Sequence, residues 1–555
     1  METKIIVIGG LSAGPSAATK ARRENEKANI KLFEKTSNIS YATCGIPYAL
    51  SGVITSRDKL LVVEADLLKL RFNVDVHLDE EVLEILPKEH QVVTTKATYD
   101  YDKLVFATGA KTIIPRVQNL EKASNWSPCR TLEDFDKIMQ KGAIDTAEHV
   151  TVLGAGLIGV EVVENLIELG KKVTLIEGGD GILPMWETKF RKFAQNTLEQ
   201  HGVEVITNTF VNEFKVEQGR IVEIPLVDKK IKTDFVLMSV GIKPSTEMLT
   251  IKGAEHIANG ALKVNEKMET SLPDIYAAGD CASIKNTITQ EHDYLPLGTH
   301  SNKGGRTAGA NAAGGNQIFK GGYKTAIIKV FENTLGRTGL NPDFMKKQGV
   351  AFETNLIVAG TTPGYYPNQK DVILETYYCP TTGKIFGCEA FGAHGVDKRI
   401  DVMSTAIYAG LTIEDLSNLD LAYAPPFSPA KDPVVVAGFV GTNAYQKTYV
   451  EITAEELMEH HEIGADFQLI DVRTNDEVDK MGMIPNSTHI PLDTLRNSTL
   501  EMLDTNKETI VFCAKGMRGY LASLQLKDKG FKNVKNLSGG FIVWSLLNPI
   551  IKAKK

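Results

Sequence analysis

The sequence predicts an α/β protein built from several domains, and three observations predict this fold class. The chain has 555 residues, and at about 150 residues per domain this length predicts three or four domains. Residues 4–14 and 150–159 both have the pattern of a buried strand that enters a Gly-rich turn and then a helix. A third passage from strand to helix, near the C-terminal end, carries Cys513. Strands and helices that alternate in this way are typical of parallel sheets covered by helices.

Composition and charge exclude several classes of protein. Hydrophobic residues make up 43% and charged residues 24% of the chain, which is ordinary for a globular protein, and the net charge of -7 argues against nucleic acid as a partner. No uncharged apolar run reaches the roughly 18 residues of a membrane-spanning helix, and no apolar signal segment precedes the first strand. The six cysteines form no C-x-x-C pair, so we expect no disulfide framework, no metal site and a reducing, cytoplasmic location.

The first Gly-rich turn contains Gly9, Gly10 and Gly14. A turn of this kind lets backbone amides at a helix N-terminus approach a pyrophosphate. The match to G-x-G-x-x-G is imperfect, because Leu11 stands at the second glycine position. The next strand ends in Glu34, an acid suited to a ribose diol. We therefore expect a dinucleotide-binding unit here.

The second Gly-rich turn is a complete match, with Gly154, Gly156 and Gly159. The strand that follows ends in Glu177, which would accept hydrogen bonds from a free 2′-hydroxyl and repel a 2′-phosphate. No arginine follows Glu177 directly to neutralise a phosphate. The turn therefore predicts a second dinucleotide site that favours NADH over NADPH.

Two further segments complete a family pattern. They are residues 102–110, which contain Thr108 and Gly109, and residues 270–280, which end in Asp280. Together with the two turns, they resemble the two-dinucleotide flavoprotein disulfide reductases over the first ~445 residues. The resemblance implies that the first turn binds FAD, that the ATG and GD segments close over it, and that Asp280 holds the ribityl chain. It also implies that the NAD domain is inserted into the FAD domain.

The segment from Ser40 to Leu50 contains a single cysteine, Cys44, and the position five further on holds Ala49 instead of a second thiol. This pattern resembles the single-cysteine branch of the family, and most of all the coenzyme A-disulfide reductases. The resemblance implies a mixed disulfide between Cys44 and CoA, which FAD reduces after it has received a hydride from NADH. A single thiol must take its disulfide partner from the substrate.

Two alternatives remain open. Water-forming NADH oxidases and NADH peroxidases cycle through a cysteine sulfenic acid with help from a histidine in the first turn, and that position is Ser12 here. Serine is not a base near neutral pH, which weakens this alternative. A sulfur carrier or redox sensor with slow flavin turnover would need a damaged NAD site, whereas the glycines and the terminal acid of that site are all present.

Residues 364–367 and 421–433 resemble the dimerisation domain of the CoA reductases. The resemblance implies a homodimer in which Tyr365 and Tyr423 of the partner subunit reach the cysteine, where a phenol can donate a proton to the leaving thiolate. Tyr366 is assigned to packing. The CoA contacts implied by the resemblance are Ser16, Lys20, Arg23, Ser40, Thr43, Arg71, Asn302 and Lys431, of which Lys20 and Arg23 are expected to clamp the ribose phosphate.

The C-terminal segment from about Tyr449 resembles a single rhodanese domain. Cys513 follows a buried strand, and the loop from Cys513 to Arg518 precedes a helix. Its amides, Lys515, Arg518 and the helix dipole form an anion cradle that favours the thiolate. The small cradle suits a persulfide or thiosulfate.

The whole chain therefore resembles a coenzyme A-disulfide reductase–rhodanese fusion. We expect an enzyme that uses NADH and FAD to reduce S–S bonds of CoA persulfide, CoA disulfide or polysulfide, with Cys513 handling sulfane sulfur. The preferred substrate and the direction of sulfur transfer stay open. The expected segments are 1–115 and 246–325 for FAD, 116–245 for NAD, 326–445 for dimerisation and 449–555 for the rhodanese domain.

Overall fold

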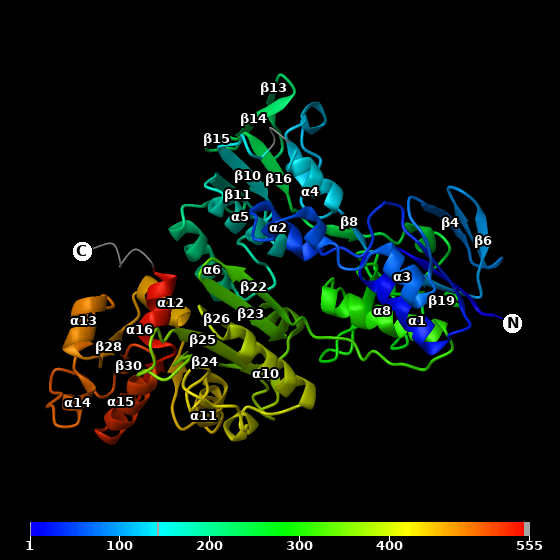
Figure 1. Ribbon diagram of the computed structural model, residues 1–555. Coiled ribbons are helices and arrows are strands. Elements are labelled where there is room, and N and C mark those ends of the chain that lie inside the picture. Colours follow the sequence, from blue (N-terminus) through cyan, green and yellow to red (C-terminus); the bar gives the residue numbers. More distant parts are fainter. Residues whose placement is uncertain (1, 141–143, 549–555) are drawn as a thin grey trace. The chain divides into compact units, whose positions relative to one another are not determined.

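The computed structural model describes residues 2–140 and 144–548, and Figure 1 shows its helices and strands. The residues form two compact units. The first unit consists of the chain up to Asp180 together with Gly202–Tyr323, and the second consists of Gly181–His201 together with the chain from Lys324 onward. Each unit has its own sheets and its own buried hydrophobic core.

A five-stranded parallel sheet carries the first Gly-rich turn at the end of its central strand. Three neighbouring strands of this sheet, residues 4–8, 103–106 and 275–277, are short and mainly apolar runs that are largely buried, as a parallel sheet covered by helices requires. In sheet order the five strands are β19 (Ile275–Ala277), β7 (Lys103–Phe106), β1 (Lys4–Ile8), β2 (Asn29–Phe33) and β3 (Asp75–His77), and helices α1 (Ala13–Glu24) and α8 (Gly298–Ala312) pack beside them.

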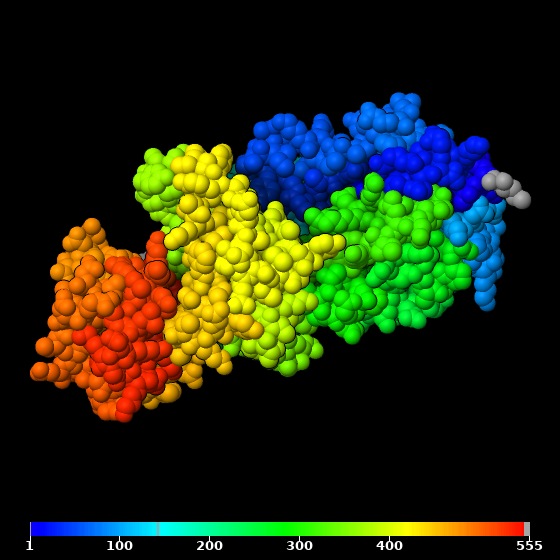
Figure 2. All heavy atoms as spheres, turned by 90° about the horizontal axis from the view of Figure 1, so that it is seen from below, coloured from blue at the N-terminus to red at the C-terminus, as the bar shows by residue number. Residues whose placement is uncertain are grey.

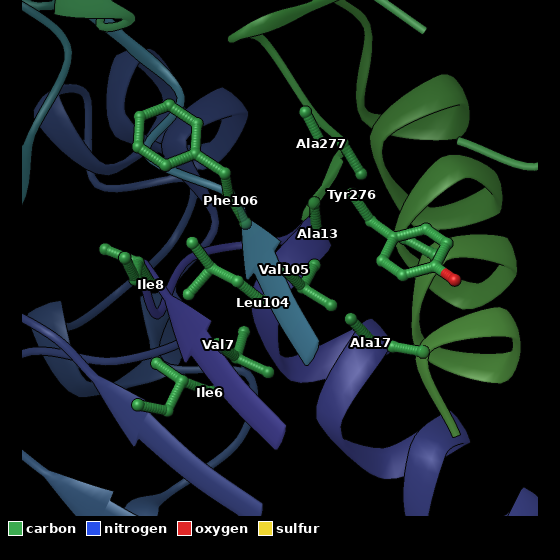
Figure 3. Close-up of a cluster of buried hydrophobic side chains, with 14 of the residues drawn as sticks. Ile6, Val7, Ile8, Ala13, Ala17, Leu104, Val105, Phe106, Tyr276 and Ala277 are labelled. Carbon is green, nitrogen blue, oxygen red and sulfur yellow. The ribbon is translucent and has the colours of Figure 1, made fainter. Parts of the chain in front are cut away.

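Helices α1 and α8 are in close backbone contact, which glycines in α8 make possible. A Cβ atom at Gly305 would lie 2.3 Å from the carbonyl oxygen of Ala13, and one at Gly309 would lie 2.0 Å from that of Ala17. Figure 3 shows both alanines beside the buried side chains of the sheet. Because α1 begins directly after the Gly-rich turn, this packing holds the turn in place.

A second parallel sheet carries the second Gly-rich turn. Its strands lie between β7 and β19 in the sequence, so the chain builds this sheet before it returns to the first one. In sheet order the strands are β12 (Glu204–Ile206), β11 (Lys172–Ile176), β10 (His149–Leu153), β16 (Phe235–Met238) and β9 (Trp126–Pro128), and helix α5 (Leu157–Glu168) follows the turn.

Smaller elements complete the first unit. Three short sheets consist of β4 (Val82–Leu86), β5 (Gln91–Thr94) and β6 (Thr98–Asp100); β13 (Lys215–Glu217), β14 (Arg220–Pro225) and β15 (Lys230–Lys232); and β18 (Leu262–Lys263), β20 (Ala282–Lys285) and β21 (His292–Asp293). Strands β8 (Ala110–Thr112) and β17 (Ile242–Pro244) form an antiparallel pair. The helices are α2 (Ile46–Leu50), α3 (Ala65–Phe72), α4 (Leu132–Ile138) and α7 (Glu247–Thr250), with short 3₁₀ turns η1 (Thr43–Gly45), η2 (Arg57–Leu60) and η3 (Leu120–Lys122).

The second unit begins with an antiparallel five-stranded sheet. Its strands, in sheet order, are β22 (Ala326–Val330), β23 (Asn333–Gly339), β26 (Ile385–Gly392), β25 (Asp371–Tyr378) and β24 (Glu353–Gly360). The accompanying helices are α6 (Thr188–Gln200), α9 (Pro342–Gln348), α10 (Val396–Ala409), α11 (Pro433–Tyr445) and the 3₁₀ turn η4 (Asp415–Asn418).

Helix α6 belongs to this second unit although its sequence lies within the range expected to bind NAD. Phe190 and Phe193 are buried, and the ring of Phe193 lies 5.4 Å from that of Phe391 in β26. Lys189 Nζ is 2.8 Å from Glu375 Oε1, and both side chains are almost fully buried. These apolar and ionic contacts attach α6 to the antiparallel sheet.

The C-terminal part of the second unit is a parallel sheet with helices. In sheet order the strands are β27 (Glu451–Ile452), β31 (Val534–Leu537), β30 (Glu508–Phe512), β28 (Phe467–Asp471) and β29 (Thr488–His489). The helices are α12 (Ala454–Glu462), α13 (Asn475–Met481), α14 (Leu492–Leu495), α15 (Met517–Asp528) and α16 (Gly540–Leu547), and α16 packs against α6. Figure 2 shows these residues, in orange and red, next to the yellow residues that precede them in the chain. The α/β fold class predicted from the sequence is confirmed.

Among residues 2–140 and 144–548, every helix falls short of the length and apolar character that a membrane-spanning helix needs.

Candidate active site

Cys44 lies in the short turn η1, directly before helix α2, and it is exposed. The segment that carries Cys44 begins in contact with the first Gly-rich turn, because the backbone N–H of Ser40 donates to the carbonyl of Gly10 at 2.8 Å. Ala49 is 6% exposed on the buried side of α2. The position where a second thiol would stand is therefore filled by a small packed side chain, and Cys44 has no protein disulfide partner.

The other cysteines of the first unit are poor candidates for thiol chemistry. Burial raises the pKa of the Cys281 thiol to about 11, and its sulfur donates to the carbonyl of Ala278 at 3.2 Å. Burial also raises the pKa of Cys129 to about 12. Both thiols therefore stay protonated at neutral pH, whereas Cys44 is open to a substrate.

A polar network lies behind Cys44 and was not predicted from the sequence. The Tyr48 hydroxyl in α2 donates to Glu161 Oε1 in α5 at 3.2 Å, and Ser51 Oγ donates to Asn165 Oδ1 at 2.5 Å. Burial raises the pKa of Glu161 to about 7. Below that pH the carboxyl group is neutral, so it adds no negative charge behind a thiolate at Cys44. The network also joins α2, the helix that follows Cys44, to α5, the helix that follows the second Gly-rich turn.

The first Gly-rich turn has the geometry of a phosphate cradle. Gly9 has a φ of +103°, and a Cβ atom there would lie 2.2 Å from the carbonyl oxygen of Ala107. A Cβ atom at Gly14 would lie 1.8 Å from the carbonyl oxygen of Gly9. Glu34 Oε2 accepts from the backbone N–H of Gly10 at 2.8 Å, so the acid lies beside the turn. These residues fit the adenosine and pyrophosphate parts of FAD.

The two segments expected to close over the flavin lie side by side, because β19 pairs with β7. Thr108 Oγ1 donates to the carbonyl of Ser245 at 2.7 Å, and Gly109 has a φ of +64°. Asp280 accepts from the Arg130 guanidinium at 2.9 Å. Arg130 was missed in the sequence because it is 150 positions away from Asp280 and lies in no motif. An acid held at this place by a cation suits hydroxyl groups of a ribityl chain.

The second Gly-rich turn repeats the geometry of the first. Gly154 has a φ of +94°, and a Cβ atom at Gly159 would lie 2.0 Å from the carbonyl oxygen of Gly154. At Gly156 a Cβ atom would meet nothing within 4 Å, which leaves open space for a pyrophosphate. Glu177 accepts from the N–H groups of Ala155 and Gly179, both at 2.7 Å. The turn therefore fits a dinucleotide whose ribose diol is read by a carboxylate.

The residues assigned to CoA are spread over both units. Ser16 Oγ donates to Asn302 Oδ1 at 2.7 Å, which brings two of them together across α1 and α8. Lys20 is 9% exposed and lies 2.5 Å from Glu24, so it is already paired with a carboxylate, whereas Arg23 is exposed. Of the others, Ser40 is buried with a φ of +48°, Thr43 is half-buried beside Cys44, and Arg71 and Lys431 are exposed, with Lys431 on the second unit.

Tyr365 and Tyr423 lie together on the second unit. Their hydroxyl oxygens are 3.5 Å apart, and the side chains are 75% and 51% exposed. The neighbouring Tyr366 is half-buried in the turn that carries Tyr365. The chain thus brings two exposed phenols, separated by 58 positions in the sequence, to one place on its surface.

Cys513 lies between β30 and α15 and is 2% exposed. Its sulfur accepts from the backbone N–H of Gly516 at 3.1 Å. Arg518 makes a two-point contact with Glu477, with N–O distances of 2.7 and 2.6 Å. Glu477 was not predicted as a site residue from the sequence, although Thr474-x-x-Glu477 has the pattern of a helix capping box, which the structure contains.

Comparisons with known protein families match most of the chain. Residues 3–299 match the pyridine nucleotide-disulphide oxidoreductase family, and residues 325–433 match its dimerisation domain. Residues 453–547 match the rhodanese-like domain. A relative from Pyrococcus horikoshii, named NAD(P)H coenzyme A polysulfide/persulfide reductase, is 34% identical over 444 residues, which cover 79% of this chain and 98% of the relative.

Two solved structures resemble nearly the entire chain. The reduced CoADR-RHD of Bacillus anthracis is 37% identical, with a TM-score of 0.93 and 99% of each chain covered. The NAD-dependent persulfide reductase of A. fulgidus is 34% identical, with a TM-score of 0.91, and the match covers 98% of this chain and 100% of that one. The chain therefore belongs to the pyridine nucleotide-disulphide oxidoreductase family and carries that family's dimerisation domain and a rhodanese-like domain in addition.

Proposed function

We propose that this protein is a flavoprotein oxidoreductase that uses NADH to reduce the S–S bond of CoA persulfide, CoA disulfide or a related polysulfide. The observation that carries the proposal is the exposure of Cys44 beside a turn that fits FAD, in a unit whose two other cysteines are buried. The name of the Pyrococcus horikoshii relative supports the choice of substrate.

Bound FAD would supply two electrons taken from NADH. The Cys44 thiolate attacks the inner sulfur of CoA–S–SH, so that a Cys44–S–S–CoA bond forms and hydrosulfide leaves. Cys44 then accepts the two electrons as this bond breaks, which returns the thiolates of Cys44 and CoA. With CoA disulfide the same attack releases one CoA thiolate in the first step.

The remaining residues position the substrate and move protons. In a homodimer, the partner subunit's Tyr365 and the partner subunit's Tyr423 would protonate the leaving thiolate, since exposed phenols are suited to receive a substrate. Arg23 and Lys431 are exposed cations suited to CoA phosphates. Ser16, Asn302, Ser40, Thr43, Arg71 and Lys20 are assigned to the same substrate.

Cys513 is proposed to take up sulfane sulfur and pass it to the CoA thiol, which supplies the persulfide that Cys44 reduces. The proposal includes a cytoplasmic location, which suits a chain whose six cysteines are all unpaired in the structure. It also assigns residues 1–115 and 246–325 to FAD binding, 116–245 to NAD binding, 326–445 to dimerisation and 449–555 to the rhodanese domain.

The test compares NADH oxidation with CoA persulfide, CoA disulfide and oxygen as acceptors, in the wild type and in Cys44→Ser. We expect turnover with CoA acceptors to exceed that with oxygen, and we expect Cys44→Ser to lose it while keeping bound FAD. Cys281→Ser serves as the matched control and should retain activity. CoA-dependent turnover that survives in Cys44→Ser would overturn the proposal.

A further inference from the structure

Both cations of the Cys513 loop are paired with carboxylates. The two-point contact between Arg518 and Glu477 is the main reason why the pKa of Glu477 is lowered to about 2, so this carboxylate is charged throughout the working pH range. Glu477 also raises the pKa of Arg518, and the Cys513 sulfur contributes to that effect. Arg518 therefore pairs with Glu477 and also interacts with the Cys513 sulfur.

The second cation is held by a residue from outside the C-terminal sheet. Lys515 Nζ lies 2.7 Å from Asp371 Oδ1, at the first residue of β25 in the antiparallel sheet. Gln369 Nε2 donates to the same oxygen at 2.8 Å. This contact joins two sheets of the second unit, and it directs the ammonium group toward Asp371.

The surroundings of the Cys513 sulfur therefore have little net positive charge from side chains. The backbone N–H of Gly516 donates to the Cys513 sulfur, and the exposed side chain of Met517 stands at the start of α15. Met517 is 65% exposed and apolar, so it offers contact to an organic group and none to an anion.

Sulfur donors differ in the charge that such a loop must stabilise. Attack of the Cys513 thiolate on the outer sulfur of an organic persulfide, R–S–SH, forms Cys513–S–SH and releases RS⁻, a leaving group with one negative charge. Attack on the outer sulfur of thiosulfate forms Cys513–S–S⁻ and releases sulfite with two negative charges. Arg518 and Lys515 are already paired with carboxylates, so they stabilise the departing sulfite dianion poorly. Glu477 and Asp371 also repel this dianion.

We propose that Glu477 and Asp371 are specificity-determining residues that make Cys513 select organic persulfides over thiosulfate. The inference rests on the proposed function for the role of Cys513 as a sulfur acceptor. Neither carboxylate touches the reacting atoms, so both act through the cations that they hold.

The experiment loads the full-length protein with sulfur in the absence of NADH. Glutathione persulfide or thiosulfate is added, the reaction is quenched and alkylated, and the persulfide at Cys513 is measured by mass spectrometry against time. Cys513→Ser provides the background. The variants are Glu477→Gln, Asp371→Asn and the double variant. Glutamine keeps the carbonyl oxygen that accepts from the Thr474 N–H at the N-terminus of α13, so the helix cap is retained while the charge is removed.

Glu508→Gln is the matched control. Glu508 begins β30, the strand that ends directly before Cys513, and it pairs with Lys535 at 2.5 Å. The variant therefore removes a paired carboxylate from the same strand at the end remote from the loop.

We expect each single variant to load sulfur from thiosulfate at least about fivefold faster than the wild type, with less than about twofold change for glutathione persulfide. The double variant should raise the ratio of the thiosulfate rate to the glutathione persulfide rate further, and Glu508→Gln should leave this ratio unchanged. An unchanged ratio, or an equal loss with both donors, would overturn the inference. Because the signal is the persulfide at Cys513 itself and no NADH is present, these outcomes do not require the reduction at Cys44. Failure of the proposed reduction is detected separately by NADH oxidation with CoA persulfide.

Discussion

At the scale of single residues, the surroundings of each side chain decide which of several similar groups does chemistry. Cys44 and Cys281 are both thiols of the first unit, but the burial that raises the pKa of Cys281 to about 11 removes it from redox chemistry. The surroundings also distinguish the acidic side chains of this unit from one another. Glu161 has a pKa raised to about 7 by burial, whereas Glu177 stands at the end of β11 with two N–H donors on its oxygens.

The environment of Glu177 predicts a preference for NADH. The Glu177 carboxylate would repel the 2′-phosphate of NADPH, whereas it would accept hydrogen bonds from the ribose diol of NADH. We therefore expect kcat/KM for NADH to exceed that for NADPH by more than about tenfold. Glu177→Gln keeps a hydrogen-bond acceptor and removes the charge, so it should reduce the difference in kcat/KM between NADH and NADPH. Steady-state kinetics with both cofactors measures the effect. Equal efficiency of the wild type with both would contradict the role given to Glu177.

At the scale of elements, single strands and turns bring together groups that act as pairs. The turn between β24 and β25 carries Tyr365, and a loop beyond α10 carries Tyr423, with 3.5 Å between the hydroxyl oxygens. Strand β25 also begins at Asp371, which holds Lys515 of the Cys513 loop. One hairpin of the antiparallel sheet therefore serves both the tyrosine pair and the rhodanese-like segment.

Removal of either phenol should slow the reduction of CoA substrates. We expect Tyr365→Phe and Tyr423→Phe each to lower kcat by about tenfold or more, as loss of a proton donor does. Because the two hydroxyls contact each other, the double variant should lose less than the product of the single losses. Tyr366→Phe is the control and should behave like the wild type. Full activity of the double variant would remove the tyrosines from the mechanism.

Strand β26 predicts a pH dependence of stability. Burial raises the pKa of Glu389 to about 8, above its value in the unfolded chain, so the folded protein keeps this proton longer than the unfolded chain does. The stabilisation is complete below the unfolded pKa and is lost as pH rises through about 8. The rise from the ordinary carboxyl pKa of 4.5 to about 8 corresponds to a loss on the order of 5 kcal/mol at high pH.

Glu389→Gln tests this dependence, because glutamine has no proton to lose and still accepts from the backbone N–H of Glu187. The Tm of the variant relative to the wild type should rise as pH increases from about 5 to about 9. Glu462→Gln changes an exposed residue of α12 and should show no such trend. Differential scanning calorimetry over this pH range gives both differences, and a Tm difference that stays constant would show that Glu389 is ionised when buried.

At the scale of the whole molecule, the two cysteines proposed to handle sulfur belong to different compact units. Cys44 lies on the first unit and Cys513 on the second. In the proposed function CoA would serve both cysteines, because its thiol ends a flexible arm, and a tethered thiol reaches effective concentrations in the millimolar range where the arm is long enough. Sulfur uptake and sulfur reduction are therefore separable steps.

Cys513→Ser should separate these two steps. Sulfide release from polysulfide supplied with catalytic CoA should be lost, whereas reduction of preformed CoA persulfide should survive, because it needs only Cys44 and the flavin. NADH-dependent sulfide production with each substrate is the measurement, and Cys379→Ser, which changes another cysteine of the second unit, is the control. Equal loss on both substrates would mean that Cys513 takes part in the reduction itself.

The sequence by itself determined the elements whose information is local. A buried strand, a Gly-rich turn and a terminal acid lie within a few tens of residues of each other, so the turns at Gly9 and Gly154 and the acids Glu34 and Glu177 were predictable from pattern and spacing. The strand, loop and helix around Cys513 were predictable for the same reason. A capping box also has a local pattern, yet the pattern at Glu477 does not indicate that the acid holds Arg518.

Only the tertiary structure decided which distant side chains meet. Arg130 reaches Asp280 across 150 positions, and Lys515 reaches Asp371 across 144. Helix α6 packs with the antiparallel sheet because its buried aromatic side chains find partners there. Such pairs have no periodicity or spacing in the sequence, since the distance between them is set by how sheets and helices pack, and packing depends on the shapes of all the side chains at once.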